Sequence, residues 1–217
     1  MPIPNHSFLD HCLIQFDLAL RTCVSGSSQA RRASPAEALN DSELSASERR
    51  HTAGLMRINH TGEVCAQALY QGQAATAKLG DVRESMQHAA AEEIDHLAWC
   101  EDRLRQLDSR TSLLNPLWYA LSYSIGAAAG IAGDKWSLGF VAETEDQVCA
   151  HLEDHLEKLP AADAKSKAIL EQMIVDEKQH GDSARNAGGA NLPAPVKQAM
   201  TIVSQLMVLN AFTTLAP

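Results

Sequence analysis

Apolar side chains recur every three to four residues along most of this chain, a spacing that predicts amphipathic helices. The pattern covers about residues 45–110 and again about 136–185. It is interrupted at Leu79-Gly80-Asp81 in the first region and near Leu159-Pro160 in the second. Because each interruption is typical of a turn, each region predicts a hairpin of two antiparallel helices.

Other segments flank these two hairpins. Residues 7–23 predict a short amphipathic helix, and a serine-rich loop follows at 25–37. Two nearly uncharged segments lie at about 111–133 and 196–216. The first reaches the ~20 residues needed to cross a membrane, but its Asn, Pro and Gly residues weaken that interpretation. Both segments fit either buried helices or an apolar surface that meets a membrane or an apolar ligand.

Four polar residues occupy positions where these stripes require apolar side chains. The helix over about 82–107 has Glu93 and His96 on its inward face, and the helix after Pro160 has Glu177 and His180 there. Each pair is a Glu-x-x-His unit, whose two side chains share one helix face. A single unit is common on a solvated helix, but two units on apolar stripes indicate a shared site.

The helix before each unit supplies one more carboxylate. Glu145 lies on the stripe of its helix, whereas Glu63 lies at the edge of a weaker stripe. Counted from the turn of each hairpin, Glu63 is at about the height of Glu93, and Glu145 at about the height of Glu177. The chain therefore contains the same arrangement twice.

The residues expected to converge in the bundle are Glu63, Glu93, His96, Glu145, Glu177 and His180. Buried carboxylates repel one another unless cations neutralise them. Four Glu and two His are the ligands of ferritin-like bundles that hold two metal ions. Oxygen and imidazole ligands suit iron, with manganese as the alternative.

Two further acids accompany the Glu-x-x-His units. Glu92 and Asp176 each stand four residues before the histidine of their own helix. That spacing lets each acid accept the distal N–H of that histidine and orient it. It is equally consistent with the sequence that Glu92 and Asp176 are ordinary solvated acids on the surface.

Composition narrows the class of protein. A formal net charge of −9 argues against nucleic-acid binding, which requires a basic surface. Five widely spaced cysteines without a CxxC pair predict neither a disulfide framework nor a thiolate metal site. The N-terminal region lacks the basic segment of a targeting peptide, so we expect a protein retained in the cytoplasm.

Taken together, these patterns predict an all-α protein. Its core is a ferritin-like four-helix bundle of two helical hairpins, with extra apolar and amphipathic helices. Residues 1–44 are expected to be an N-terminal extension that includes the serine-rich loop, and residues 45–217 a single di-metal domain.

Several motifs resemble the demethoxyubiquinone hydroxylase family of ubiquinone biosynthesis. They are Arg57-Ile58-Asn59-His60-Thr61-Gly62-Glu63, Tyr70-Gln71-Gly72-Gln73, Asn115-Pro116-Leu117-Trp118 and Phe140-Val141-Ala142-Glu143-Thr144-Glu145. Both Glu-x-x-His units follow the family's order. The similarity covers about residues 45–217, and as a set these motifs are specific.

The resemblance implies a di-iron monooxygenase. It would hydroxylate the ring of a polyprenylated methoxy-methyl-benzoquinol with O2 and two electrons, which would come from an external electron donor or from the quinol itself. Of the six metal ligands, Glu93 and Glu177 would bridge the two ions, while Glu63 and Glu145 would be terminal. The resemblance implies no catalytic residue beyond the ligands, and the sequence contains no nicotinamide or flavin motif.

The resemblance also implies a place in the cell. The segments at 111–133 and 196–216 would bind the cytoplasmic face of the cell membrane peripherally and guide the prenyl tail. A homo-oligomer or a complex of ubiquinone-biosynthesis proteins would fit such a surface.

Two other functions use parts of the same pattern. A ferritin-like iron store or ferroxidase would use the same ligands but needs a cage-forming surface, in which the uncharged segments are hard to place. A non-enzymatic membrane-associated scaffold would keep its function after metal binding is lost.

Overall fold

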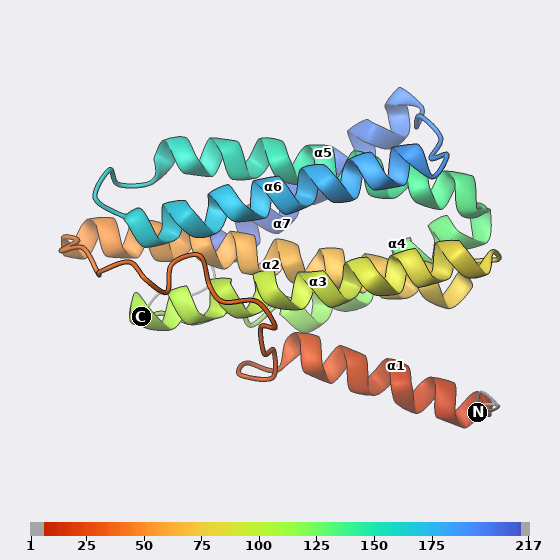
Figure 1. Cartoon of the computed structure of the whole chain (residues 1–217), viewed down its shortest axis with the longest axis horizontal. Helices are drawn as coiled ribbons and strands as arrows, with labels where there is room; N and C mark the ends of the chain where they lie inside the picture. The colour runs from red at the N-terminus through yellow and green to blue at the C-terminus, as the bar shows by residue number, and fades with distance from the viewer. Residues whose placement is uncertain (1–6, 214–217) are drawn as a thin grey trace.

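The structure, a computed structural model, describes residues 7–213. Within that range it consists of seven helices and no strands, so the predicted all-α class is confirmed. The helices are α1 (Phe8–Cys23), α2 (Ala46–Thr76), α3 (Gly80–Gln106), α4 (Asn115–Ala132), α5 (Asp134–Lys158), α6 (Ala164–Asn186) and α7 (Ala194–Thr213) (Figure 1).

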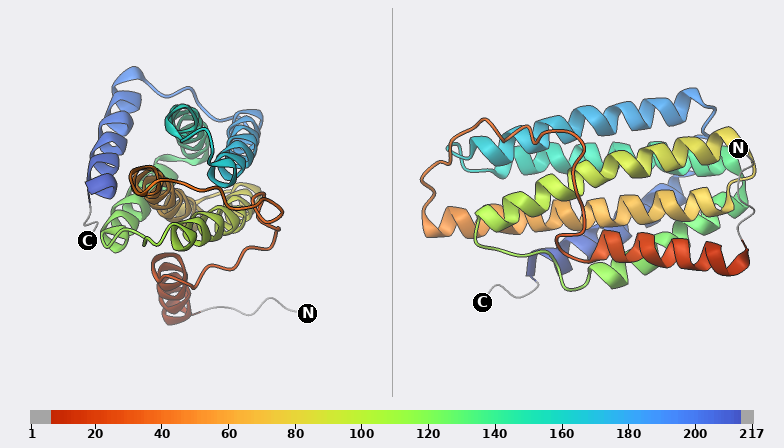
Figure 2. Two further views of the ribbon diagram at one scale, coloured as in Figure 1. Left: turned by 90° about the vertical axis from the view of Figure 1, so that its left-hand side faces the viewer. Right: turned by 60° about the horizontal axis from the view of Figure 1, so that its bottom comes forward.

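Helices α2, α3, α5 and α6 form a four-helix bundle made of two hairpins, α2–α3 and α5–α6 (Figures 1 and 2). Local chemistry sets where two of them begin. Ser45 and Glu48 form a capping box at the start of α2, and the Asp163 carboxylate accepts the Ser166 N–H at the start of α6. The two predicted hairpins are therefore present, with turns close to the predicted interruptions.

Helix α2 is enclosed on nearly every side, because α3, α4 and α7 all pack against it. Glycines bring α4 close. A Cβ on Gly72 would lie 2.3 Å from the carbonyl oxygen of Tyr123, and one on Gly126 would lie 2.3 Å from that of Leu69. A helix covered all round has no single apolar stripe, which explains the weak pattern around Glu63.

Helices α4 and α7, formed by the two uncharged segments, are each buried on one face only. Helix α4 buries Trp118 but leaves Leu117 62% exposed, and α7 buries Met207 but leaves Leu206 51% exposed. Trp118 and Met207 share one cluster with Ile58 of α2, so both helices pack their inner faces against α2. Residues 214–216 of the predicted C-terminal segment lie outside the described residues.

Across residues 7–213, none of the helices is both long enough and apolar enough to span a bilayer.

Helix α1 lies on the outside of the bundle, against α2 and α4 (Figure 2). It begins at a capping box of Ser7 and Asp10, and near its end the Thr22 hydroxyl donates to Gln67 Oε1 at 2.8 Å. The loop between α1 and α2 then runs back across α3 (Figure 1). This loop contacts the rear of the site described next.

Candidate metal centre

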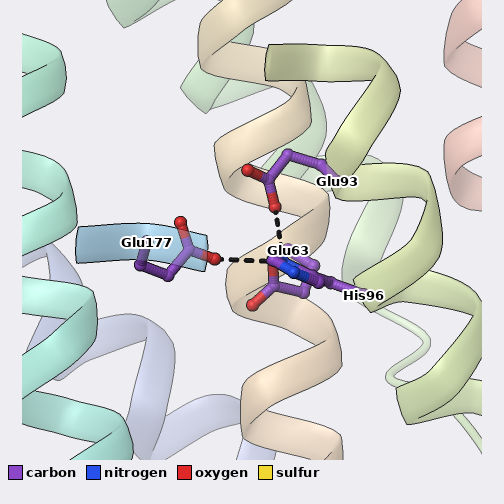
Figure 3. Close-up of side chains that lie close together, drawn as sticks. All are labelled: Glu63, Glu93, His96 and Glu177. Atoms are coloured by element: carbon purple, nitrogen blue, oxygen red, sulfur yellow. Dashed lines mark hydrogen bonds and ion pairs between the residues drawn. The ribbon is translucent and has the colours of Figure 1, made fainter. Parts of the chain in front are cut away.

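The six predicted ligands meet in the middle of the bundle. Two groups of donor atoms are close enough to hold metal ions: Glu63, Glu93, His96 and Glu177 in one, and Glu145, Glu177 and His180 in the other. The four glutamates are each 2% exposed or less. Figure 3 shows the carboxylates of the first group converging on the His96 ring from α2, α3 and α6. Helix α5 supplies Glu145 to the second group.

Glu93 and Glu177 occupy the centre between the two histidines. Glu93 lies 3.1 Å from His96 Nδ1 and 3.2 Å from His180 Nδ1. Glu177 lies 3.0 Å and 3.3 Å from the same two atoms. Glu63 reaches His96 alone, at 3.5 Å. A carboxylate next to both histidines is placed to bridge two ions, and one next to a single histidine is placed to be terminal.

The protonation of the cluster reflects its burial and crowding. Burial and the neighbouring Glu93 and Glu177 carboxylates raise the pKa of Glu63 well above its usual range. The pKa of Glu145 is raised by the same causes. Burial alone would lower the pKa of His180, but its interactions with Glu177 and Glu93 outweigh burial and raise that pKa to about 12. Protons and metal cations compete for these lone pairs, so metal binding would displace protons.

The donor set fits two divalent cations. Each of the four glutamates has one buried oxygen that makes no hydrogen bond: Glu63 Oε2, Glu93 Oε1, Glu145 Oε2 and Glu177 Oε1. All but the Glu145 oxygen face a histidine Nδ1 at 3.0–3.5 Å, as ion-pair contacts only. An unsatisfied buried carboxylate oxygen is costly, and a metal ion is the partner that removes the cost. Two divalent ions also balance the four negative charges of the ionised carboxylates.

Glu92 and Asp176 do contact the histidines, but the predicted pairing within each helix is wrong. Asp176 Oδ2 lies 2.9 Å from Nε2 of His96, on the other hairpin. Glu92 Oε2 lies 2.9 Å from Nε2 of His180. Each distal imidazole nitrogen points across the bundle, away from the acid one turn earlier on its own helix, so the partner comes from the facing helix.

A cavity of about 290 Å³ lies beside the cluster, between α2, α4, α5 and α7. Glu63 forms part of its wall, so the cavity and the cluster share a carboxylate. Asn59 and His151 add polar atoms, and His151 Nε2 is buried without a hydrogen-bond partner. Most of the remaining wall is apolar and includes Leu69, Ile125, Phe140, Val148, Val203 and Met207.

Comparison with known proteins identifies the family. Residues 50–211 match the family described as "Ubiquinone biosynthesis protein COQ7". A 3-demethoxyubiquinol 3-hydroxylase of Stutzerimonas stutzeri (strain A1501) is 62% identical over 208 residues, which are 95% of this chain and 97% of that protein. The protein of the same name from Pseudomonas fluorescens (strain SBW25) is 60% identical and covers 96% of this chain and 97% of its own length. The chain belongs to the COQ7 family.

Membership in the COQ7 family confirms the resemblance inferred from the motifs and does not favour the iron-store and scaffold alternatives. The curated relatives align with nearly the whole chain. The similarity therefore extends into the N-terminal extension, where the motifs gave no resemblance.

The sequence did not predict the contacts of two side chains near the carboxylate–histidine cluster. Tyr70 donates its hydroxyl to Glu145 Oε1. His60 is buried beneath α4 beside the Asn115 amide. Neither contact has a signal in the sequence, because both depend on which helix covers α2.

Two further histidines of α5, His151 and His155, lie beside the cavity, and His151 forms part of its wall. His155 Nδ1 donates to Asn59 Oδ1 at 2.7 Å, and the His151 and His155 rings lie 4.0 Å apart. Asn59 is on α2, far from His155 in the sequence, so the sequence could not predict this hydrogen bond.

Proposed function

We propose that this chain is an O2-dependent 3-demethoxyubiquinol 3-hydroxylase, the activity for which its curated relatives are named. The observation that carries the proposal is the shared wall between the carboxylate–histidine cluster and the apolar cavity, at Glu63. A polyprenylated quinol needs an apolar pocket that brings its ring to the oxidising centre, and the apolar lining of this cavity next to Glu63 supports its use as that pocket.

The six ligands predicted from the sequence would hold two iron ions in this proposal. Glu93 and Glu177, next to both histidines, would bridge them, and Glu63 and Glu145 would be terminal. When bound, the metal pair supplies the activation of O2, with two electrons from an external donor. One oxygen atom enters the ring C–H bond as a hydroxyl, and the other leaves as water with two protons.

The protein's own residues position the substrate and exclude water. The apolar wall keeps water from the ring, and α7 closes the cavity through Val203 and Met207. The free Nε2 of His151 is available for a hydrogen bond with a ring oxygen of the quinol. The Tyr70 hydroxyl holds one oxygen of Glu145 and leaves the other for metal.

Loss of a bridging carboxylate tests this function. Glu177→Ala is expected to lose both metal ions and at least 100-fold of the hydroxylation rate. Glu171→Ala is the matched control, because Glu171 is an exposed glutamate on the same helix. Metal analysis gives the binding, and mass spectrometry of quinones from a hydroxylase-deficient strain gives the activity. Normal hydroxylation by a metal-free Glu177→Ala protein would refute the proposal.

We also propose that the protein binds a membrane surface peripherally, through the outer faces of α4 and α7. These faces expose apolar side chains: Leu117, Leu121, Ile131, Ile202, Leu206, Leu209 and Phe212. The inner face of α7 lines the cavity, so a prenyl tail that leaves the cavity past α7 would enter the bilayer directly. An exposed apolar surface of this kind is typical of a membrane or protein contact.

Sedimentation with phospholipid vesicles tests the membrane proposal. Leu206→Glu and Leu117→Glu are expected to weaken vesicle binding at least several-fold. Val175→Glu is the control, because Val175 is equally exposed but lies on α6, away from this surface. Equal binding by all three variants would refute the assignment of this surface.

A further inference from the structure

The loop between α1 and α2 places one arginine directly behind the metal cluster. Arg32 lies in this loop, which crosses α3 (Figure 1). The loop also precedes the part of the chain that matches the COQ7 family, which begins at residue 50. The arginine therefore comes from outside the helices that supply the ligands.

Arg32 binds two carboxylates at once. Its Nε lies 2.7 Å from Asp95 Oδ2, and its Nη2 lies 2.8 Å from Asp176 Oδ2. Both acids are largely buried, with side chains 4% and 12% exposed. The backbone amide of Arg31 donates to the other Asp95 oxygen at 2.6 Å. The loop thus supplies both a charge and a backbone donor to this pair of acids.

A tryptophan holds the guanidinium in place. The Arg32 guanidinium carbon lies 4.9 Å from the centre of the Trp99 ring, and Trp99 Nε1 donates to the Arg32 carbonyl at 3.4 Å. Arginine is the residue suited to this position, because its planar guanidinium can stack on an aromatic ring while its separate N–H groups reach two acids.

Asp176 connects Arg32 to the cluster. The same oxygen, Oδ2, contacts Arg32 and lies 2.9 Å from His96 Nε2. His96 is fully buried, and its Nδ1 faces Glu93 and Glu177. The position of the His96 ring is therefore set through Asp176 by a residue of the N-terminal loop.

The other histidine has a weaker support. The Glu92 carboxylate, which contacts His180, is 39% exposed, and its ion pairs within residues 7–213 are with His180 and with His88. The His88 side chain is itself 76% exposed. The two halves of the centre have the same ligand types, but a buried arginine-bound acid orients one histidine and a solvated acid orients the other.

We propose that Arg32 is a positioning residue for the metal ion at His96, and that it makes this ion the more tightly held of the two. The inference rests on the proposed metal centre. Fixing a ligand's hydrogen-bond partner pre-organises the ligand, and loss of such outer partners typically costs about 10- to 100-fold in metal affinity. The effect should fall on one metal position only, since Arg32 contacts one of the two orienting acids.

Metal release from the full chain tests the inference. The protein is loaded with Fe(II) under anaerobic conditions, and a ferrous chelator then removes the metal. We expect two phases in the wild-type protein, one for each ion. In Arg32→Met the slow phase should become about 10-fold faster or more while the fast phase is unchanged, and one of the two Mössbauer doublets should change.

Two matched variants complete the experiment. Arg31→Met removes the same charge from the same loop, but Arg31 reaches Asp95 through its backbone amide, so both phases should remain as in the wild type. Arg32→Lys keeps the charge but cannot bind both acids at once. The rate of its slow phase should therefore lie between those of the wild type and Arg32→Met. Identical release by Arg32→Met and the wild type, or equal effects of Arg31→Met and Arg32→Met, would overturn the inference.

A chemical rescue separates positioning from folding. Arg32→Ala should release the slow ion quickly, and millimolar ethylguanidinium should slow that release again, whereas ethylammonium should not. The Tm of the metal-free variants reports the fold independently.

Fast release that ethylguanidinium leaves unchanged would overturn the inference. A wild-type chain that binds no iron would overturn the metal centre and this inference together, whereas two tightly held ions unaffected by Arg32 would overturn this inference alone.

Discussion

The Asp176 carboxylate lies 2.9 Å from Nε2 of His96, a histidine of the opposite hairpin. Glu92 stands in the same relation to His180. Each hairpin therefore orients the histidine in the Glu-x-x-His unit of the other. This exchange ties the α2–α3 and α5–α6 hairpins together at the centre, and metal binding should depend on how the two hairpins pack.

A double-mutant cycle should detect the exchange. Asp176→Asn is expected to weaken metal binding about 10-fold by loosening His96. Combined with His96→Gln it should add little, because that histidine is already absent. Combined with His180→Gln its effect should be additive. Metal titration of the wild type, the three single variants and the two double variants gives both cycles, and coupling of Asp176 with His180 in place of His96 would contradict the arrangement.

Filling the cavity should weaken substrate binding. Val203 lines the cavity from α7, and Val203→Trp is expected to raise KM for a polyprenylated quinol about 10-fold or more. A quinol with a shorter tail should be affected less. Gln205→Trp is the control, because Gln205 is an exposed residue of the same helix that belongs neither to the cavity wall nor to the apolar membrane-facing set. Steady-state kinetics with both quinols gives the result, and equal KM values for the two variants would place the substrate elsewhere.

The close contact of α2 with α4 predicts opposite effects at two glycines of one helix. Gly72→Ala would place a Cβ 2.3 Å from the Tyr123 carbonyl oxygen, and should lower the free energy of unfolding by about 1–3 kcal/mol. A Cβ at Gly62 would meet no atom within 4 Å. Gly62→Ala should therefore raise the free energy of unfolding by up to about 1 kcal/mol, because alanine has the higher helix propensity. Urea unfolding compares the two variants, and a neutral Gly72→Ala would show that α4 can move away.

Acid should destabilise the protein through buried neutral histidines. Burial lowers the pKa of His60 to about 4. Burial, with the neighbouring His151, lowers the pKa of His155 to about 3. Both folded values are below the ~6.5 of an unfolded histidine. Between about pH 6.5 and 3 the unfolded chain therefore binds protons that the folded chain does not, and stability falls as the pH falls.

His155→Gln should isolate this effect. In metal-free protein the pH dependence of the unfolding free energy between pH 6 and 4 should become shallower by about 1.4 kcal/mol per pH unit, the value for one proton. His88→Gln, at an exposed histidine, should leave the slope unchanged. Urea unfolding at several pH values measures this slope. An unchanged slope in His155→Gln would contradict a neutral buried His155.

Much of the architecture could be predicted because helix periodicity is a local property. The α3 and α6 stripes located Glu93, His96, Glu177 and His180, since each of these helices has one buried face. The turns near Gly80 and Pro160 defined the two hairpins, because glycine and proline interrupt a helix at their own position in the sequence. Glu63 was harder to place, because α2 is covered on nearly all sides and a fully covered helix carries no stripe.

Sequence alone determined the helices and the repeated arrangement of four glutamates and two histidines, and it indicated the family. Only the tertiary structure decided which acid orients which histidine, that Tyr70 reaches Glu145, and that Arg32 binds the acids behind His96. The physical reason is the range of the interactions. Periodicity places a side chain on a face of its own helix, whereas a hydrogen-bond partner depends on the rotation and height of a neighbouring helix, which packing between distant segments sets.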